Sequence, residues 1–272
     1  MSDITLSSAV RSSLTSLQST ADLLGQTQER LATGNRVNSA LDDPTAFFTA
    51  SALNNRASDL STLLDTQQQA IRTVEVADQG LSAISDLIDS ARAQATAALQ
   101  TEDLATRTAA GEAFNAILDQ IEGIAEDSSF NGTNLLEGDS LQVIFNESGD
   151  NSLTVDGVDL SDAADTGGLN LADVTFTDDD ATINDALAAI DTALGTVRST
   201  AASLGADLST IQVRQDFTAN LINSLEAGAG DLTLADLNEE GANLLTLQTR
   251  QSLASTSLSF ATQSDQSVLQ LL

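Results

Sequence analysis

The sequence predicts a mainly α-helical protein: a long antiparallel helical coiled-coil rod with paired terminal helices and a small acidic β-hairpin and loop tip. Apolar residues recur at alternating spacings of three and four over long stretches in both halves of the chain. The 272 residues contain one proline, so few positions interrupt a helix. Glycine and aspartate gather between residues 131 and 181, which predicts turns and short strands there.

The composition excludes most catalytic chemistry. The chain has 40 acidic and 10 basic residues, all of the latter Arg, a net charge of −30, and no His or Cys. Without imidazole, thiol or amine side chains, we predict no enzyme activity, no metal site and no cofactor. The negative charge repels phosphate backbones and anionic lipids, so we expect neither nucleic acid nor a membrane as a partner.

The first predicted element is an assembly helix over residues 1–34. Its seam is apolar at every position but Gln28: Val10, Leu14, Leu17, Ala21, Leu24 and Leu31. Gly34 ends the helix, since glycine readily adopts the left-handed conformation that follows a helix.

A polar break follows over residues 35–43. We expect Arg36, Asn38, Asp42 and Asp43 to hold its geometry through caps and ion pairs. Asp43 directly precedes Pro44, the only proline, which predicts an N-cap followed by proline at the first helical position.

Rod helices are predicted over residues 44–130. The seam continues from Ala46 to Leu81, and a helix from Pro44 to about residue 100 would be about 85 Å long at 1.5 Å per residue. That length suits a rod rather than a compact domain. A shorter series from Phe114 to Ile124 predicts a further helix that ends near Asp127.

Residues 131–181 are predicted to form an acidic, solvent-facing β-hairpin and outer loop region. Residues 131–190 hold 13 acids and no Arg, and short strands are expected at LQVIF, SLTVDG and DVTFT. By contrast, residues 1–60 carry 6 acids and 4 Arg, and residues 233–272 carry 4 acids and 1 Arg. Both chain ends can therefore approach other protein without strong repulsion.

The C-terminal half repeats the pattern in reverse. Thr182 and Asp185 predict a capping-box start for a rod helix over residues 182–226. The glycines of AGAGD predict a break over residues 227–233, and residues 234–272 form a second assembly helix. The residues of this helix expected at the assembly interface are Leu237, Leu244, Leu247, Leu258, Val268 and Leu269.

This order of elements predicts self-assembly. A chain that runs out along helices and returns along helices brings its terminal helices together at one end. Each has apolar residues beyond its seam, such as Leu23, Leu253 and Phe260, that a two-helix contact leaves uncovered. We therefore expect the terminal helices to be poorly ordered in the monomer and to fold when copies stack.

Three motifs resemble those of bacterial flagellins. ERLATGNRVNSALDDPTAFFTASALNNRASDL, from Glu29 to Leu60, is similar to the N-terminal signature of that family. FNGTNLLEG is similar to the element after its second rod helix, and NEEGANLLTLQTRQSLASTSLSFATQSDQSVLQLL is similar to its C-terminus. The resemblance covers about residues 1–140 and 180–272 and is nearest to short alphaproteobacterial flagellins.

The resemblance implies a structural subunit of the extracellular flagellar filament, which serves motility. The terminal helices would form the inner tubes, and the chain would be secreted without a cleaved signal peptide. Implied partners are copies of itself, the flagellar type III export apparatus, a flagellin chaperone on the C-terminal helix, and the cap and hook-junction proteins. Arg92 would lie in the patch that an innate immune receptor recognises, but Ala93, Gln94 and Ala95 beside it predict that recognition is lost.

Three other functions fit parts of the pattern. A hook–filament junction protein shares both terminal signatures, and an acidic helical secretion chaperone or adaptor is also amphipathic and free of His. Open-ended growth on a filament seed would favour a subunit, whereas saturation at small size would favour an adaptor. An enzyme would need two converging carboxylates, and the acids of the tip lie in glycine-rich, exposed sequence.

Overall fold

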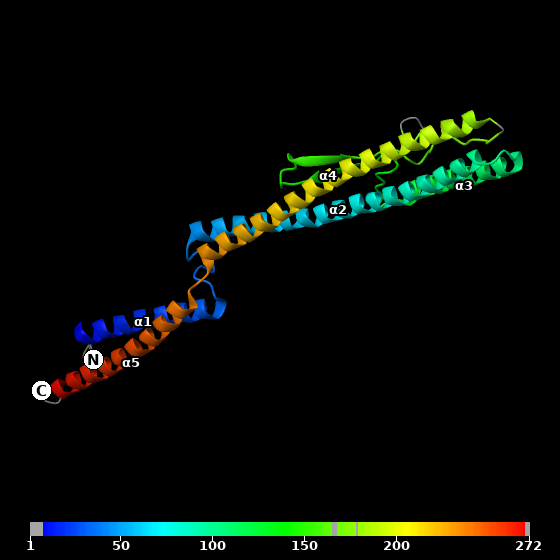
Figure 1. Cartoon of the computed structure of the whole chain (residues 1–272). Coiled ribbons are helices and arrows are strands. Elements are labelled where there is room, and N and C mark those ends of the chain that lie inside the picture. The colour runs from blue at the N-terminus through cyan, green and yellow to red at the C-terminus, as the bar shows by residue number, and fades with distance from the viewer. Residues whose placement is uncertain (1–7, 165–167, 178, 270–272) are drawn as a thin grey trace. The chain divides into compact units, whose positions relative to one another are not determined.

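The computed structural model describes residues 8–164, 168–177 and 179–269, and within them the chain forms five helices and one hairpin (Figure 1). The elements are α1 (Ser8–Thr33), α2 (Pro44–Leu99), α3 (Leu104–Asp127), β1 (Ser140–Ile144), β2 (Ser152–Asp156), α4 (Asp180–Thr233) and α5 (Leu237–Leu269). The predicted mainly helical fold with a small antiparallel tip is confirmed. The chain divides into two compact units, residues 1–55 with 224–272, and residues 56–223.

In the first unit, α1 packs against α5. From Leu244 to Leu258 the seam of α5 lies where the sequence predicts: Leu247 is buried, and Leu244, Ala254 and Leu258 are half-buried. Leu237, predicted on the same seam, is instead 52% exposed, because it lies in the first turn at the edge of the contact. Val268 and Leu269 lie outside the residues whose side chains the structure describes.

The seam of α1 departs from its prediction at alternate positions. Val10 is buried, and Leu17, Leu24 and Leu31 are half-buried, as expected. Leu14 is 40% exposed, however, and Thr20 and Thr27 are buried in place of Ala21 and Gln28. Burial of Thr20 is tolerated because its hydroxyl donates to the Ser16 carbonyl at 2.8 Å.

The predicted break over residues 227–233 is wrong, because α4 continues through both glycines to Thr233. Glycine in a helix costs roughly 0.5–1 kcal/mol relative to alanine, and burial of the neighbouring Leu225 and Ala229 offsets that cost. The interruption is residues 234–236. Asp236 then caps α5 by accepting the backbone N–H of Asn238 at 2.8 Å.

The core of the second unit is formed by α2, α3, α4 and the segment between α3 and α4. Its largest fully buried side chains include Leu81, Ile84 and Ile88 of α2, Phe114 and Ile121 of α3, and Leu160 and Phe176 of the segment before α4. The charge of residues 131–181 predicted that this region faces solvent. That prediction is wrong for its apolar side chains. The described carboxylates of the region are exposed, while its apolar residues close the core.

The tip contains two of the three predicted strands. β1 pairs antiparallel with β2, with Ser140 opposite Asp156 and Ile144 opposite Ser152. The segment DVTFT is not a strand. Val174 instead bonds the side chain of Asn115 through both its N–H, at 3.0 Å, and its carbonyl, at 3.1 Å.

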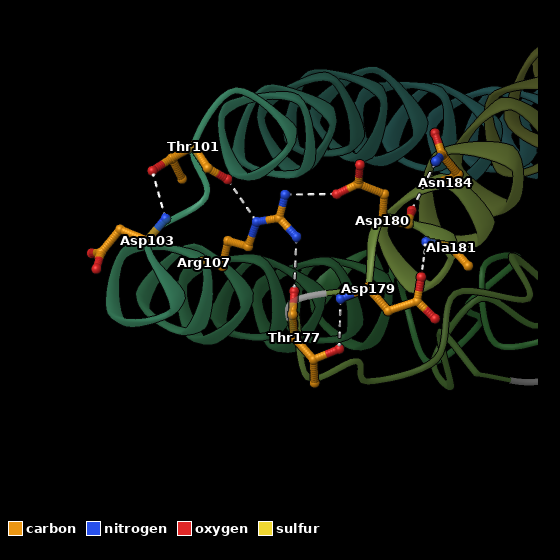
Figure 2. A network of polar contacts seen from close by, with 8 residues as sticks. All are labelled: Thr101, Asp103, Arg107, Thr177, Asp179, Asp180, Ala181 and Asn184. Atoms are coloured by element: carbon orange, nitrogen blue, oxygen red, sulfur yellow. Dashed lines mark hydrogen bonds and ion pairs between the residues drawn. The ribbon is translucent and has the colours of Figure 1, made fainter.

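The predicted capping box at Thr182 is also wrong. α4 begins two residues earlier, at Asp180, and Asp179 accepts the backbone N–H of Ala181 at 2.9 Å. Arg107 of α3 explains the earlier start, because its guanidinium bonds Asp180 Oδ1 at 2.6 Å and so holds the first turn of α4 (Figure 2).

Candidate assembly surfaces

The two interruptions beside the terminal helices bond to each other. Gly34 ends α1 with φ +71°, and its carbonyl accepts the N–H of Ala235 at 3.0 Å. The Arg36 N–H donates to the Thr233 carbonyl at 2.7 Å, and its guanidinium donates to the Leu232 carbonyl at 3.1 Å. Arg36 thus holds the break through backbone carbonyls, not through the ion pair that the sequence suggests.

Two neighbouring aspartates shape the residues before α2. Asp42 Oδ2 accepts the N–H groups of Asn38 at 3.0 Å and Ser39 at 2.9 Å. The Ser39 backbone bond, followed by that of Asn38, lowers the pKa of Asp42. Asp43 caps α2 by accepting the N–H of Ala46 at 3.0 Å, with Pro44 as the first helical residue.

A largely buried ion pair joins α1 to α5. Arg30 donates to Glu240 Oε1 at 2.9 Å, and Glu240 is 7% exposed. Sequence reasoning missed this pair because its partners lie 210 positions apart. The available signal was Glu240, a charged residue among leucines on the seam, which requires a cation opposite it when it is buried.

The outward face of α5 is apolar as well. Leu245, Leu253 and Phe260 are 67%, 63% and 68% exposed, and Leu237 is 52% exposed. At 100° per residue, Leu245, Leu253 and Phe260 point roughly opposite to the seam that contacts α1, whereas Leu237 lies at the edge of that seam. α5 therefore has two apolar faces, and α1 covers one of them within the chain.

Further apolar residues are exposed on α1 and near the start of α2. Leu14 and Leu23 flank the contact line of α1, at 40% and 46% exposure. Leu41 is 96% exposed and Phe48 is 63% exposed. A monomer that exposes this much apolar surface around one helix pair needs an interaction partner.

The far turn of the second unit is held by Arg107 (Figure 2). This guanidinium is 4% exposed and donates to the carbonyls of Thr101, at 2.7 Å, and Thr177, at 3.1 Å, as well as to Asp180. Three chain segments therefore meet on one buried cation. Sequence reasoning missed Arg107, which no motif marks.

Arg92 lies on α2 and forms an ion pair with Asp191 of α4. The chain thus places this arginine between helices of the second unit, facing an acid. Among the described residues, no group of three or more acidic side chains is arranged to hold a metal ion, and no helix is both long and apolar enough to span a membrane.

Comparison with known proteins identifies the family. The profile described as "Bacterial flagellin N-terminal helical region" matches residues 4–140, and the "Bacterial flagellin C-terminal helical region" matches residues 187–272. Flagellin FljM of Caulobacter vibrioides is 33% identical over 100% of this chain and 98% of its own. A flagellin of Brucella melitensis is 31% identical over 100% of this chain and 99% of its own.

A solved structure, the crystal structure of Bacillus cereus flagellin, matches 56% of this chain and 88% of that chain, with a TM-score of 0.48 and 21% identity. The named relatives do not favour a junction protein, a chaperone or an enzyme. The chain belongs to the bacterial flagellin family and is a structural subunit of the flagellar filament.

Proposed function

We propose that copies of this chain assemble through the outward faces of α1 and α5, so that the terminal helices form the inner tubes of the filament. The observation that supports this proposal is the second apolar face of α5, formed by Leu245, Leu253 and Phe260, which α1 leaves uncovered. Burying one such side chain stabilises a contact by about 1.5–3 kcal/mol. The gain repeats in every subunit of a polymer.

The same proposal covers the remaining interface residues. Leu247, Leu258 and Leu244 pack the helix pair, while Leu14 and Leu23 extend the apolar surface onto α1. Because single amphipathic helices are marginal in water, the pair gains stability when neighbouring copies cover it. Order in the isolated monomer stays a prediction, and limited proteolysis of dilute protein tests it: ends as resistant as the second unit would refute it.

The tip residues 131–181 face outward from the filament in this scheme. Their described carboxylates are exposed, and a charged surface of one sign resists close packing against copies of itself. The nearly neutral terminal helices face one another instead.

Family membership also supports a set of export and capping partners. These are the flagellar type III export apparatus, a chaperone on the C-terminal helix, and the cap and hook-junction proteins. Export without cleavage predicts that subunits from sheared filaments have the mass of the intact chain apart from removal of Met1. A shorter N-terminus would contradict it.

The patch around Arg92 is proposed not to serve immune recognition. The guanidinium of Arg92 is paired with the carboxylate of Asp191. The next residues on α2 are the small or neutral Ala93, Gln94 and Ala95. A receptor reporter assay on monomeric protein tests this: a response equal to that of a stimulatory flagellin would overturn it.

The assembly proposal is tested by Leu253→Asp. Leu253 is 63% exposed and belongs to the outward face of α5, not to the seam that contacts α1. The variant should therefore keep its helical circular dichroism but lose growth on sheared filament seeds. Asn243→Asp is the matched control, because Asn243 is also exposed on α5 but lies to the side of the apolar face. Seeded growth of Leu253→Asp at the rate of the control would exclude this face as an assembly surface.

A further inference from the structure

The turn after α3 contains the one Asn–Gly pair of the sequence, Asn131–Gly132. Both residues are exposed, with φ +52° and +82°, and a Cβ added to Gly132 would meet no atom within 4 Å. The Phe130 N–H donates to the Thr133 carbonyl at 2.9 Å, and the Thr133 N–H donates to the Phe130 carbonyl at 3.1 Å. Positive φ at both central residues of a two-residue loop defines a type I′ turn. The pair thus lies at the open end of a tight hairpin turn.

An asparagine that precedes glycine can cyclise without an enzyme. The backbone nitrogen of Gly132 loses its proton to hydroxide and attacks Cγ of Asn131, so that a C–N bond forms. The Cγ–Nδ2 bond then breaks, and the amide nitrogen leaves as ammonia after taking a proton from water. A water molecule opens the resulting five-membered imide at either carbonyl, which gives aspartate or isoaspartate at position 131. Glycine favours this reaction because no side chain shields its nitrogen.

The structure leaves both reacting groups of this pair accessible. Among the described residues, neither the side-chain amide of Asn131 nor the N–H of Gly132 forms a hydrogen bond. The imide ring fixes ψ of Asn131 at about −120°, which is the value of the first central residue in a type II′ turn. A flip of the peptide between the two residues converts the type I′ turn into type II′, and glycine accepts the change of sign in its φ. Because both turns close a two-residue hairpin, the ring can form without opening the bonds between Phe130 and Thr133.

The one Asp–Gly pair of the sequence, Asp156–Gly157, provides an internal comparison. It would form the same imide by loss of water, but the N–H of Gly157 donates to the Asp139 carbonyl at 2.9 Å. A Cβ added to Gly157 would lie 2.3 Å from that carbonyl oxygen and 2.5 Å from the Leu135 carbonyl oxygen. The nitrogen of Gly157 is therefore both bonded and enclosed, and the fold protects this pair.

We infer that Asn131 is a site of spontaneous deamidation in the folded chain, and that its isoaspartate product opens the turn. Isoaspartate carries the main chain through Cβ, so the loop gains one backbone atom and the two bonds between Phe130 and Thr133 lose their register. The reaction needs only hydroxide and water, so its rate rises with pH. This inference goes beyond the proposed assembly and does not depend on it.

The turn is connected to the end of α3 by the next residue but two. Asn134 is 2% exposed, and its Nδ2 donates to the carbonyls of Ala125 at 2.7 Å and Glu126 at 3.0 Å. These two carbonyls belong to the last turn of α3, where no further helical N–H follows to bond them. Opening the turn therefore weakens the cap of this helix.

Peptide mapping by mass spectrometry tests the site. The full-length chain is incubated at pH 8 in water enriched in heavy oxygen, which labels each imide that opens. The peptide with Asn131 should take up one heavy oxygen and separate into aspartate and isoaspartate forms, at least tenfold faster than the peptide with Asp156. An unmodified Asn131, or equal rates at the two pairs, would overturn the inference.

Two controls separate the role of the fold from that of the sequence. In urea, both pairs should react, because unfolding frees the Gly157 nitrogen; reaction of Asn131 in urea alone would overturn the inference. Asn131→Gln is the matched variant, since its longer side chain would have to form a six-membered ring, which closes far more slowly. Heavy oxygen in the same peptide of Asn131→Gln would place the reaction at another residue and would also overturn the inference.

Hydrogen exchange tests the effect of the isoaspartate on the turn. Asn131→Asp adds the same charge with an ordinary backbone, and aspartate, like asparagine, tolerates positive φ. The incubated chain should lose protection at the N–H of Thr133 and in the last turn of α3, whereas Asn131→Asp should keep it. Equal protection in the two samples would show that the product leaves the turn closed, contrary to the inference.

Discussion

At the scale of single residues, we expect the ion pair between Arg30 and Glu240 to fix the register of α1 on α5. Glu240 is 7% exposed, and Arg30 Nε is buried without a hydrogen-bond partner in the described part of the chain. A second acceptor is therefore lacking, and removing Glu240 would leave the guanidinium fully unmatched. Buried polar groups of this kind tolerate few alternative registers.

Glu240→Ala should destabilise the α1–α5 pair by about 1–3 kcal/mol, the cost of leaving a buried partner unsatisfied. Amide hydrogen exchange in α1 and α5 measures the change, and exchange in α2 and α3 should stay the same. Glu239→Ala is the control, since Glu239 is exposed on the same turn. Unchanged protection in α1 would show that the pair does not set the register.

Asp207 on α4 gives a prediction about how stability depends on pH. Burial, and then the nearby charge of Asp156, raises its pKa above the ordinary value of 3.8. A raised folded pKa in an acid penalises the folded state above that pKa, and the penalty disappears below pH 3.8. Asp207→Asn should therefore raise the melting temperature at pH 7 but not at pH 3.

Calorimetric melts at the two pH values check this prediction, with Asp216→Asn as the control, an exposed acid of the same helix. A gain at pH 3 as large as that at pH 7 would assign the effect to packing instead of charge.

Residue-level prediction from the sequence succeeded where one local interaction decides the geometry. Asp43 before Pro44 and Gly34 after a helix are determined by neighbours within four positions, and the structure has both. Arg107 and Glu240 could not be assigned, because their partners come from segments 73 and 210 positions away. Thr182 was misassigned because the contact of Arg107 with Asp180 moves the helix start.

At the scale of elements, α4 shows how burial outweighs local propensity. The sequence AGAGD has two poor helix formers within three residues, yet the helix runs through both. Their neighbours Leu225 and Ala229 are buried, and breaking the helix would expose them. The spacing of apolar residues and their burial thus determine how far α4 extends, whereas glycine content alone predicts the wrong end for this helix.

Gly228→Ala should stabilise the first unit by roughly 0.5–1 kcal/mol, the difference between glycine and alanine in a helix. A Cβ at Gly228 would meet Leu53 Cδ1 at 3.6 Å, an ordinary contact. At Gly230 it would meet Leu234 Cδ1 at 3.1 Å, so Gly230→Ala should gain less. Hydrogen exchange in the last turns of α4 measures both, and loss of protection in Gly228→Ala would place a functional bend there.

The terminal helices illustrate a different limit of sequence reasoning. The heptad pattern located the seam of α5 from Leu244 to Leu258, because leucines and alanines recur there at the helical spacing, but it also placed the exposed Leu237 on that seam. On α1 the apolar line at Leu14 and Ala21 is not the line that contacts α5, and Thr20 and Thr27 take those places. A helix that is apolar on several sides fits more than one partner, so its pattern cannot say which side meets which. A subunit that assembles needs such a helix, because different sides of the helix then contact different partners.

At the scale of the whole molecule, charge and apolar surface are separated along the chain. The terminal segments are nearly neutral and expose leucines, while residues 131–190 carry 13 acids and no Arg. The sequence predicted this division because it depends on composition alone. The boundaries of the two units, at residues 55–56 and 223–224, lie inside α2 and α4, where no change in the helical pattern marks them.

The net charge of −30 sets how assembly should depend on salt. Repulsion between whole subunits acts over the Debye length, which falls from about 30 Å at 0.01 M salt to about 8 Å at 0.15 M. Added salt therefore weakens this repulsion, whereas the burial of leucines at the terminal helices is not weakened by salt. Seeded growth should accelerate steadily from 0.01 M to 0.15 M sodium chloride, as followed by light scattering at fixed subunit concentration. Growth that slows with added salt would mean that ion pairs between subunits, and not the apolar faces of α1 and α5, dominate the assembly free energy.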